Sequence, residues 1–198
     1  NFTVDPYLIE DVMVAGHNLC LAGPPKLGKT MLLADAAVSL GSGTPFLGHF
    51  DVPEAVPVLM LSGESGEKTL RRYCKVIQDQ RGIDGSGVQI TWGMQLPALS
   101  NPKDLRTLER VIEKHGFRVV IIDPIYLALL KGGGKTDTHR LMEMGLLLGE
   151  ISDIGQRTGA TIVVCHHANQ SLKIGEVMDL RKMNGSGFDA WSRSWILG

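Results

Sequence analysis

Short runs of apolar residues recur along this chain of 198 residues, and longer stretches with a helical pattern separate them. Four of the five runs are continuously apolar, which is typical of strands that are covered on both faces. The runs are residues 18–22, 56–61, 88–92, 118–123 and 161–165. Strands of this kind lie inside a fold, so the segments between them must supply the covering layers.

The four stretches between these runs have the character of helices. They are residues 29–40, 66–81, 102–114 and 138–157. The third has the clearest boundaries, because Asn101 can cap it, Pro102 suits its first turn and Gly116 follows its end. The order of elements predicts an α/β fold with a mostly parallel central sheet and helices on both faces. Ligands of such sheets bind beyond the carboxyl ends of the strands.

Composition and charge narrow the class of protein. The chain is 43% hydrophobic and 21% charged, as is usual for a globular protein, and its net charge is −1. No overall basic field indicates nucleic-acid binding, so any such contact would have to be local. The three cysteines are far apart and odd in number, which favours a reducing, cytoplasmic location. No apolar run approaches the ~18 residues of a membrane helix.

Domain organisation follows from the length. We expect residues 1–198 to form a single domain. The chain lacks an initiator Met and ends in SWILG, which reads as part of a strand. We therefore expect it to be a fragment of a longer protein.

Residues 23–30 read GPPKLGKT and meet the pattern G-x-x-x-x-G-K-[ST] in full. The segment follows an apolar run and begins a helical stretch, which is the context of a phosphate-binding loop and argues against a chance match. Backbone N–H groups there can surround phosphates, Lys29 would reach the β- and γ-phosphates, and Thr30 would help to hold Mg²⁺. The predicted nucleotide-binding residues are Gly23, Pro24, Pro25, Lys26, Leu27, Gly28, Lys29, Thr30 and Met31.

Two carboxylates follow apolar runs and are candidates for the chemistry of this site. Asp123 ends a predicted strand, which suits a Mg²⁺ ligand; the alternative is an Asp that only starts a turn before Pro124. Many ATPases carry a Glu directly after this Asp to activate water, but here Pro124 stands in its place. Glu64 lies just past another predicted strand and is the candidate base, with a surface turn as the alternative.

Histidines and arginines add weaker candidates. His166 and His167 end the last apolar run, where one could sense the γ-phosphate, or one could pack and the other be solvated. Arg72 lies on a helical stretch whose charged positions could simply face solvent. Arg193 stands between two tryptophans and could stack on them or reach a phosphate, including one on a neighbouring subunit.

Together these residues resemble the RecA/DnaB-like P-loop ATPases, in particular the RepA-type hexameric plasmid replicative helicases and their AAA_25-type relatives. The resemblance extends over about residues 15–197. It is carried by GPPKLGKT (23–30), VPVLMLSGESGEKTLRRY (56–73), RVVIIDP (118–124), TGATIVVCHHANQ (158–170) and NGSGFDAWSRSWIL (184–197).

The resemblance implies a RecA-like fold and roles for several residues. Glu64 would be the catalytic base, Asp123 the Mg²⁺ residue, and His166 or His167 the γ-phosphate sensor. Arg72 and Arg193 would contact phosphates, one of them across a subunit boundary. The implied cofactors are ATP and Mg²⁺, and the implied assembly is a homo-oligomer, a hexameric ring.

Several functions are compatible with such a site. The leading hypothesis is a ring-forming ATPase that acts on single-stranded DNA as a helicase or translocase. DNA would bind loops near 131–137 and 169–184, through Lys131, Lys135, Lys173, Arg181 and Lys182. The alternatives are an oligomeric ATP-driven regulator without DNA activity, a P-loop small-molecule kinase and a non-enzymatic nucleotide-binding scaffold.

Overall fold

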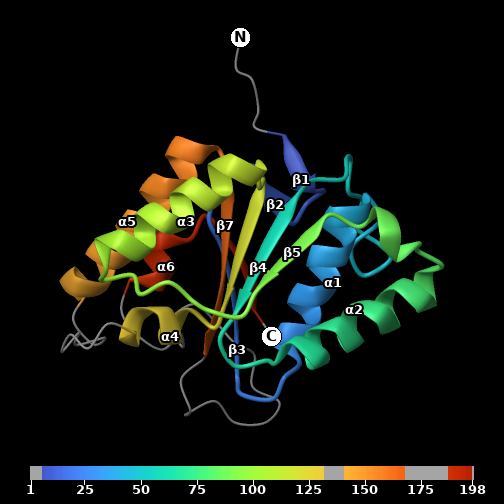
Figure 1. Cartoon of the computed structure of the whole chain (residues 1–198), viewed down its shortest axis with the longest axis horizontal. Coiled ribbons are helices and arrows are strands. Elements are labelled where there is room, and N and C mark those ends of the chain that lie inside the picture. Colours follow the sequence, from blue (N-terminus) through green and yellow to red (C-terminus); the bar gives the residue numbers. More distant parts are fainter. Residues whose placement is uncertain (1–5, 132–140, 168–186, 198) are drawn as a thin grey trace.

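The structure is a computed structural model, and it describes residues 6–131, 141–167 and 187–197. Six parallel strands form the central sheet, in the order β5-β4-β6-β7-β3-β8. Figure 1 shows this sheet in the middle of the molecule, with helices to either side. Their bounds are β3 Leu19–Gly23, β4 Val58–Ser62, β5 Ile90–Gly93, β6 Val119–Asp123, β7 Thr161–His167 and β8 Ser194–Leu197. The predicted parallel sheet is confirmed, and the ends of most of its predicted strands shift slightly.

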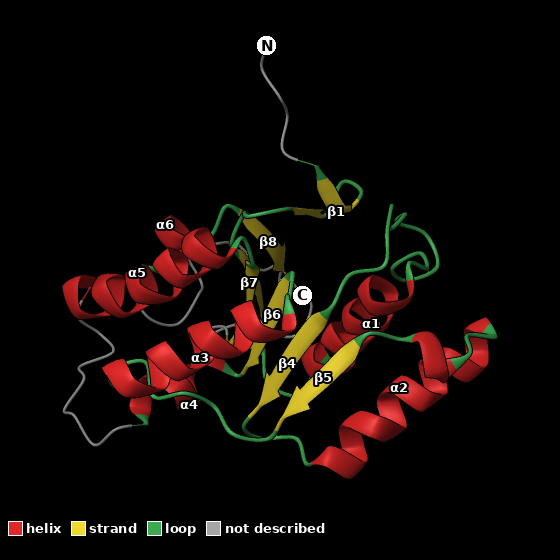
Figure 2. Ribbon diagram, turned by 45° about the horizontal axis from the view of Figure 1, so that its top comes forward, coloured by secondary structure: helices red, strands yellow, loops and turns green. Residues whose placement is uncertain are grey.

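Helices cover both faces of this sheet (Figure 2). The helices α1 Lys29–Ser42 and α2 Glu67–Arg81 lie on one side. The helices α3 Pro102–His115 and α5 Leu141–Thr158 lie on the other. The predicted α/β class with helices on both faces is therefore confirmed, and none of the helices in the described part of the chain is long and apolar enough to cross a membrane.

The continuously apolar strands follow from this layered arrangement. In β6, Val119 and Ile121 pack into the core on the side of α1, whereas Val120 and Ile122 pack under α3 and α5. All four are buried. Since successive side chains of a strand point to opposite faces, a strand between two helical layers must be apolar at every position.

The boundaries of α3 form as expected. The Asn101 side chain accepts a hydrogen bond from the backbone N–H of Lys103 at 3.0 Å, and Pro102 is the first helical residue. Gly116 ends the helix with φ 64°, a left-handed conformation that glycine adopts without strain.

Short elements escaped prediction because they span too few residues to set a hydrophobic period. They are the antiparallel pair β1 Tyr7–Ile9 and β2 Met13–Val14, the 3₁₀ turn η1 Gly85–Gly87, and the helices α4 Ile125–Leu130 and α6 Phe188–Trp191. Of these, α4 has functional interest, because it directly follows Asp123 and Pro124 at the end of β6.

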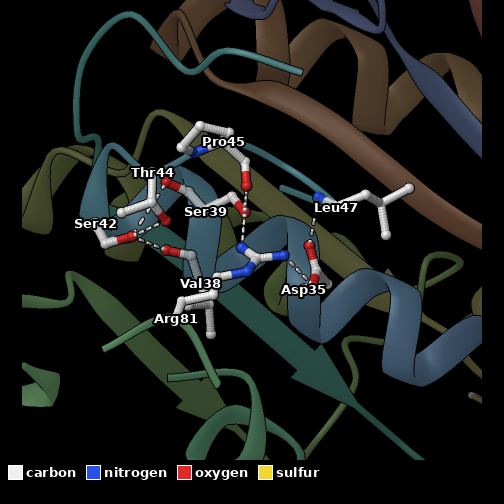
Figure 3. Close-up of polar contacts among 8 residues, drawn as sticks. All are labelled: Asp35, Val38, Ser39, Ser42, Thr44, Pro45, Leu47 and Arg81. Atoms are coloured by element: carbon white, nitrogen blue, oxygen red, sulfur yellow. Dashed lines mark hydrogen bonds and ion pairs between the residues drawn. The ribbon is translucent and has the colours of Figure 1, made fainter. Parts of the chain in front are cut away.

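An ion pair joins the two helices on the α1 side of the sheet (Figure 3). Arg81, the last residue of α2, contacts Asp35 of α1 at 2.5 Å and donates a hydrogen bond to Ser39 at 2.8 Å. The other Asp35 oxygen accepts from the backbone N–H of Leu47 at 3.0 Å, and Ser39 donates to the Pro45 carbonyl at 3.3 Å. The end of α2, the middle of α1 and the loop after α1 are thus held together by one polar cluster.

Loss of this ion pair should lower stability appreciably. The side chains of Arg81 and Asp35 are only 19% and 13% exposed, so Arg81→Ala would leave the Asp35 charge largely out of water. We expect Arg81→Ala to lower the free energy of unfolding by about 2 kcal/mol, measured by urea denaturation.

Arg71→Ala is the matched control for this prediction. Arg71 pairs with Glu67 on the same helix, but these side chains are 69% and 54% exposed, so its loss should cost no more than about 0.5 kcal/mol. If the two variants lose equal free energies of unfolding, burial does not make the Arg81–Asp35 ion pair more stabilising than the exposed one.

Candidate functional site

Strand register brings together the carboxyl ends of the four strands that precede or carry most of the predicted site residues. Gly23, at the end of β3, pairs with His167, at the end of β7. Ser62, at the end of β4, pairs with Asp123, at the end of β6. Since these four strands are neighbours and parallel, their carboxyl ends form a single rim, where ligands of such sheets bind.

The phosphate-binding loop crosses this rim between β3 and α1. Lys26 and Gly28 have φ values of 66° and 80°, so the backbone turns sharply twice before the helix begins at Lys29. Glycine takes the second of these conformations without strain. The positive end of α1 and its free N–H groups therefore face the loop, which suits an anion.

Lys29 folds back beneath the loop. Its Nζ donates hydrogen bonds to the carbonyls of Gly23 at 2.9 Å and Pro24 at 2.7 Å, and the residue is only 8% exposed. The ammonium group thus lies inside the curve of the loop, where it can meet phosphate oxygens.

Thr30 and Asp123 meet across 93 positions of sequence. The Thr30 Oγ1 donates a hydrogen bond to Asp123 Oδ2 at 2.7 Å, and Asp123 is only 4% exposed. A hydroxyl and a carboxylate at this separation present two of the oxygen ligands that Mg²⁺ prefers.

The donor set fits Mg²⁺ with phosphate better than a metal held by protein alone. Among the described residues, no three His, Cys, Asp or Glu side chains form a metal-binding group. Mg²⁺ commonly takes one or two protein ligands and completes its shell with water and substrate phosphates. The Thr30–Asp123 pair beside the loop matches that arrangement.

Cys165 lies close to Asp123 but has no role at the site. Burial raises the pKa of its thiol, and the neighbouring Asp123 raises it further. The thiol therefore stays protonated and inert, as expected for a buried cysteine at the end of an apolar run.

Glu64 projects from an exposed turn after β4. The turn is fixed to the end of β6 by a 2.9 Å hydrogen bond from the backbone N–H of Gly63 to the Asp123 carbonyl. The Ser62 hydroxyl accepts a 3.2 Å hydrogen bond from the backbone N–H of Ser65. A Cβ at Gly63 would stand 2.6 Å from a methyl group of Leu96, so any larger residue there would require the Leu96 side chain to shift. Glu64 thus lies at the rim beside Asp123, and its role as the base stays a prediction.

Tyr126 is a site residue that the sequence did not reveal. Its hydroxyl donates a hydrogen bond to Glu64 Oε1, and its ring lies 5.4 Å from the His167 ring. The hydrogen bond to Glu64, followed by burial, raises the pKa of Tyr126 to about 12. Tyr126 stands in the apolar stretch after Pro124, and no residue pattern there distinguishes it from a packing residue.

The two histidines occupy different environments. His166 is 6% exposed and stacks on Phe188 at 3.9 Å between ring centroids, in the core under α3 and α5. His167 follows it on the extended strand and so points to the opposite face. Burial lowers the pKa of His167, the nearby Lys29 charge lowers it further, and Glu64 and Asp123 partly oppose this. This placement favours His167 over His166 as the candidate sensor.

Arg72 is exposed on α2 and lies at the margin of the site. Together with Met31, Tyr73 and Val76 it lines a surface groove between α2 and the first turn of α1. Arg72 thus lies near Met31 in the first turn of α1, and its predicted contact with a phosphate stays a prediction.

Arg193 lies at the amino ends of the strands, opposite the rim. Its backbone N–H donates to the Asn18 carbonyl at 2.9 Å, just before β3 and β8 begin. The phosphate loop starts at the other end of β3, roughly 15 Å away along a strand of five residues. Arg193 therefore does not belong to the chain's own site, and a contact with a phosphate would have to be made in another subunit.

The predicted DNA-binding segments fall almost entirely outside the described residues. This applies to Lys135, Lys173, Arg181 and Lys182. Lys131, at the end of α4, is described, and its ammonium group donates to the Leu96 carbonyl at 2.6 Å.

Nucleotide binding should depend on Lys29 and its Mg²⁺ dependence on Asp123. Lys29→Ala removes the buried charge aimed at the phosphates, so we expect ATP affinity to fall at least about tenfold by calorimetry. Asp123→Asn should abolish the gain in affinity on adding Mg²⁺. Lys114→Ala, on an exposed lysine at the far end of α3, is the control and should bind normally. Unchanged affinity in Lys29→Ala would contradict this account of the loop.

Comparisons with known proteins agree with this fold. The chain superposes on the crystal structure of a KaiC-like protein from the hyperthermophilic archaeon Pyrococcus horikoshii with a TM-score of 0.61 and 18% sequence identity. The match covers 96% of this chain and 74% of that one, and it shows a shared RecA-like α/β fold. The model of the AAA domain family AAA_25 matches residues 2–171. Since that range spans most of the sequence, the chain belongs to the AAA_25 family and is an AAA-type, RecA-like ATPase domain.

Proposed function

We propose that this chain hydrolyses ATP with Mg²⁺ and is the motor domain of a ring-forming DNA helicase or translocase. The observation that carries the proposal is the rim formed by Lys29, the Thr30–Asp123 pair and Glu64 at the ends of neighbouring strands. This set combines a phosphate cradle, Mg²⁺ ligands and a carboxylate that can act on water.

Each residue of the rim has a distinct task in hydrolysis. Lys29 would bind the β- and γ-phosphates, and Thr30 and Asp123 would hold Mg²⁺, which would neutralise charge on the phosphates. Glu64 orients the attacking water and accepts its proton. His167, neutral because its pKa is lowered, can donate or accept a hydrogen bond near the γ-phosphate.

A neighbouring position supports Glu64 as the base. Pro124 follows Asp123 and offers no group that can activate water. Glu64 stands in the turn just after β4, whose neighbour in the sheet is β6, and this turn is hydrogen-bonded to the Asp123 carbonyl. The carboxylate absent beside Asp123 is thus supplied from the adjacent strand.

Action on DNA is the finer part of the proposal. In the sequence, the segment 131–137 begins directly after α4, and the segment 169–184 begins two residues after His167, the last residue of β7. Few residues of the chain therefore separate the site from these segments, so a change at the site on hydrolysis could be passed to them. Their lysines and arginines would contact the backbone of single-stranded DNA.

Turnover measurements test hydrolysis and the role of DNA separately. We expect Mg²⁺-dependent ATP hydrolysis that single-stranded DNA stimulates severalfold. Glu64→Gln should lower kcat at least about hundredfold while ATP still binds, because the loss is confined to the chemical step.

Three outcomes discriminate among the hypotheses. If single-stranded DNA does not change the rate of ATP hydrolysis, the oligomeric regulator is favoured. Phosphoryl transfer to a small hydroxyl compound favours the kinase. Normal turnover in Glu64→Gln would remove Glu64 from the role of base.

Assembly into a ring predicts that each site is shared between subunits. Arg193 lies at the amino ends of the strands, whereas the phosphate loop of the same chain lies at their carboxyl ends. We therefore propose that Arg193 contacts the phosphates bound by a neighbouring subunit. Arg193→Ala and Glu64→Gln should each be nearly inactive, yet mixing them should restore turnover, because some interfaces then combine an intact Glu64 with an intact Arg193.

A second mixture controls for subunit exchange alone. Lys29→Ala mixed with Glu64→Gln places both defects in the same half of the site, so no interface is complete and no recovery is expected. If Arg193→Ala fails to complement at every ratio although the subunits co-assemble, Arg193 has no role in trans.

A further inference from the structure

Glu64 occupies a position that does not by itself fix its side chain. The residue is exposed, and Gly63 and Gly66 flank its turn. An exposed glutamate samples several rotamers, and ordering it costs conformational entropy. A base that must align one water molecule with a phosphorus atom needs a partner that restricts this freedom.

Tyr126 is placed to be that partner, and its own position is well determined. It is the second residue of α4, and its neighbours Ile125, Ala128 and Leu129 are buried at 2% exposure or less. Its ring rests against His167 with the ring planes at 50°. The hydroxyl therefore reaches Glu64 from a helix that is anchored in the core.

The contact leaves half of the Glu64 carboxylate available. Tyr126 donates to Oε1, so Oε2 keeps its lone pairs for the attacking water. A phenol that stays protonated throughout the neutral range acts as a constant donor and does not compete for the proton that Glu64 removes.

We propose that Tyr126 is a positioning residue for hydrolysis, which holds Glu64 through Oε1. The inference rests on the proposed function, because it assigns Tyr126 to Glu64 as the base. It adds a residue from α4, the helix that leads from Asp123 toward the segment beginning at Lys131.

The geometry separates this role from a purely structural one. The hydrogen bond lies at the surface, so Tyr126→Phe leaves Glu64 in contact with water and creates no buried unpaired group. The phenylalanine ring preserves the contact with His167. The variant should therefore fold normally, and its effect should be confined to the orientation of Glu64.

The test compares kinetics in two backgrounds. Tyr126→Phe should lower kcat for ATP about tenfold and change KM less than about twofold, because nucleotide binding does not use Glu64. In Glu64→Gln, adding Tyr126→Phe should cause no further loss in single-turnover hydrolysis and no change in ATP affinity, since Tyr126 acts only through the carboxylate. Tyr7→Phe, at the exposed first residue of β1, is the matched control and should leave kcat and KM unchanged.

The possible results separate this inference from the function on which it rests. An unchanged or increased kcat in Tyr126→Phe, while Glu64→Gln is inactive, overturns the role of Tyr126 and leaves the base assignment intact. An equal further loss in the Glu64→Gln background shows that Tyr126 acts independently of Glu64 and also overturns it. Normal turnover in Glu64→Gln removes Glu64 from the role of base, and with it the premise of this inference, while ATP hydrolysis itself stands.

Discussion

The register of four parallel strands is the constraint on which the site depends. β7 lies between β3 and β6, so the loop after β3 and the aspartate at the end of β6 are separated by one strand rather than adjacent. The 2.7 Å contact between Thr30 and Asp123 spans that gap above the end of β7. A shift of one residue in any pairing would turn the ligand-bearing side chains to the opposite face.

The fold was largely predictable because its signals are local and redundant. Five apolar runs and four helical stretches define the layers, and α3 shows how a cap, a proline and a terminal glycine also mark boundaries. The phosphate loop was equally clear, because its residue spacing and its position between a strand and a helix agree. Asp123 and Glu64 could be named because strand ends in such folds converge.

The parts of the site that escaped prediction depend on tertiary contacts. Tyr126 stands in an apolar stretch and acquires its partner, Glu64, from 62 positions away. The two histidines could not be told apart until Phe188 was found stacked on His166. Arg193 was equally open between two uses, and only the direction of β8 places it away from its own loop. Sequence spacing carries no information about such contacts.

The hydrogen bonds of Lys29 have a consequence for nucleotide exchange. An arriving triphosphate must compete with the carbonyls of Gly23 and Pro24 for the ammonium group, rather than with bulk water. The net contribution of Lys29 to nucleotide affinity is then the difference between its hydrogen bonds to the phosphates and its hydrogen bonds to these two carbonyls. When the phosphates leave, the ammonium group returns to the carbonyls. Product release therefore does not leave the buried Lys29 charge without hydrogen-bond partners, which suits an ATPase that must release its product in every cycle.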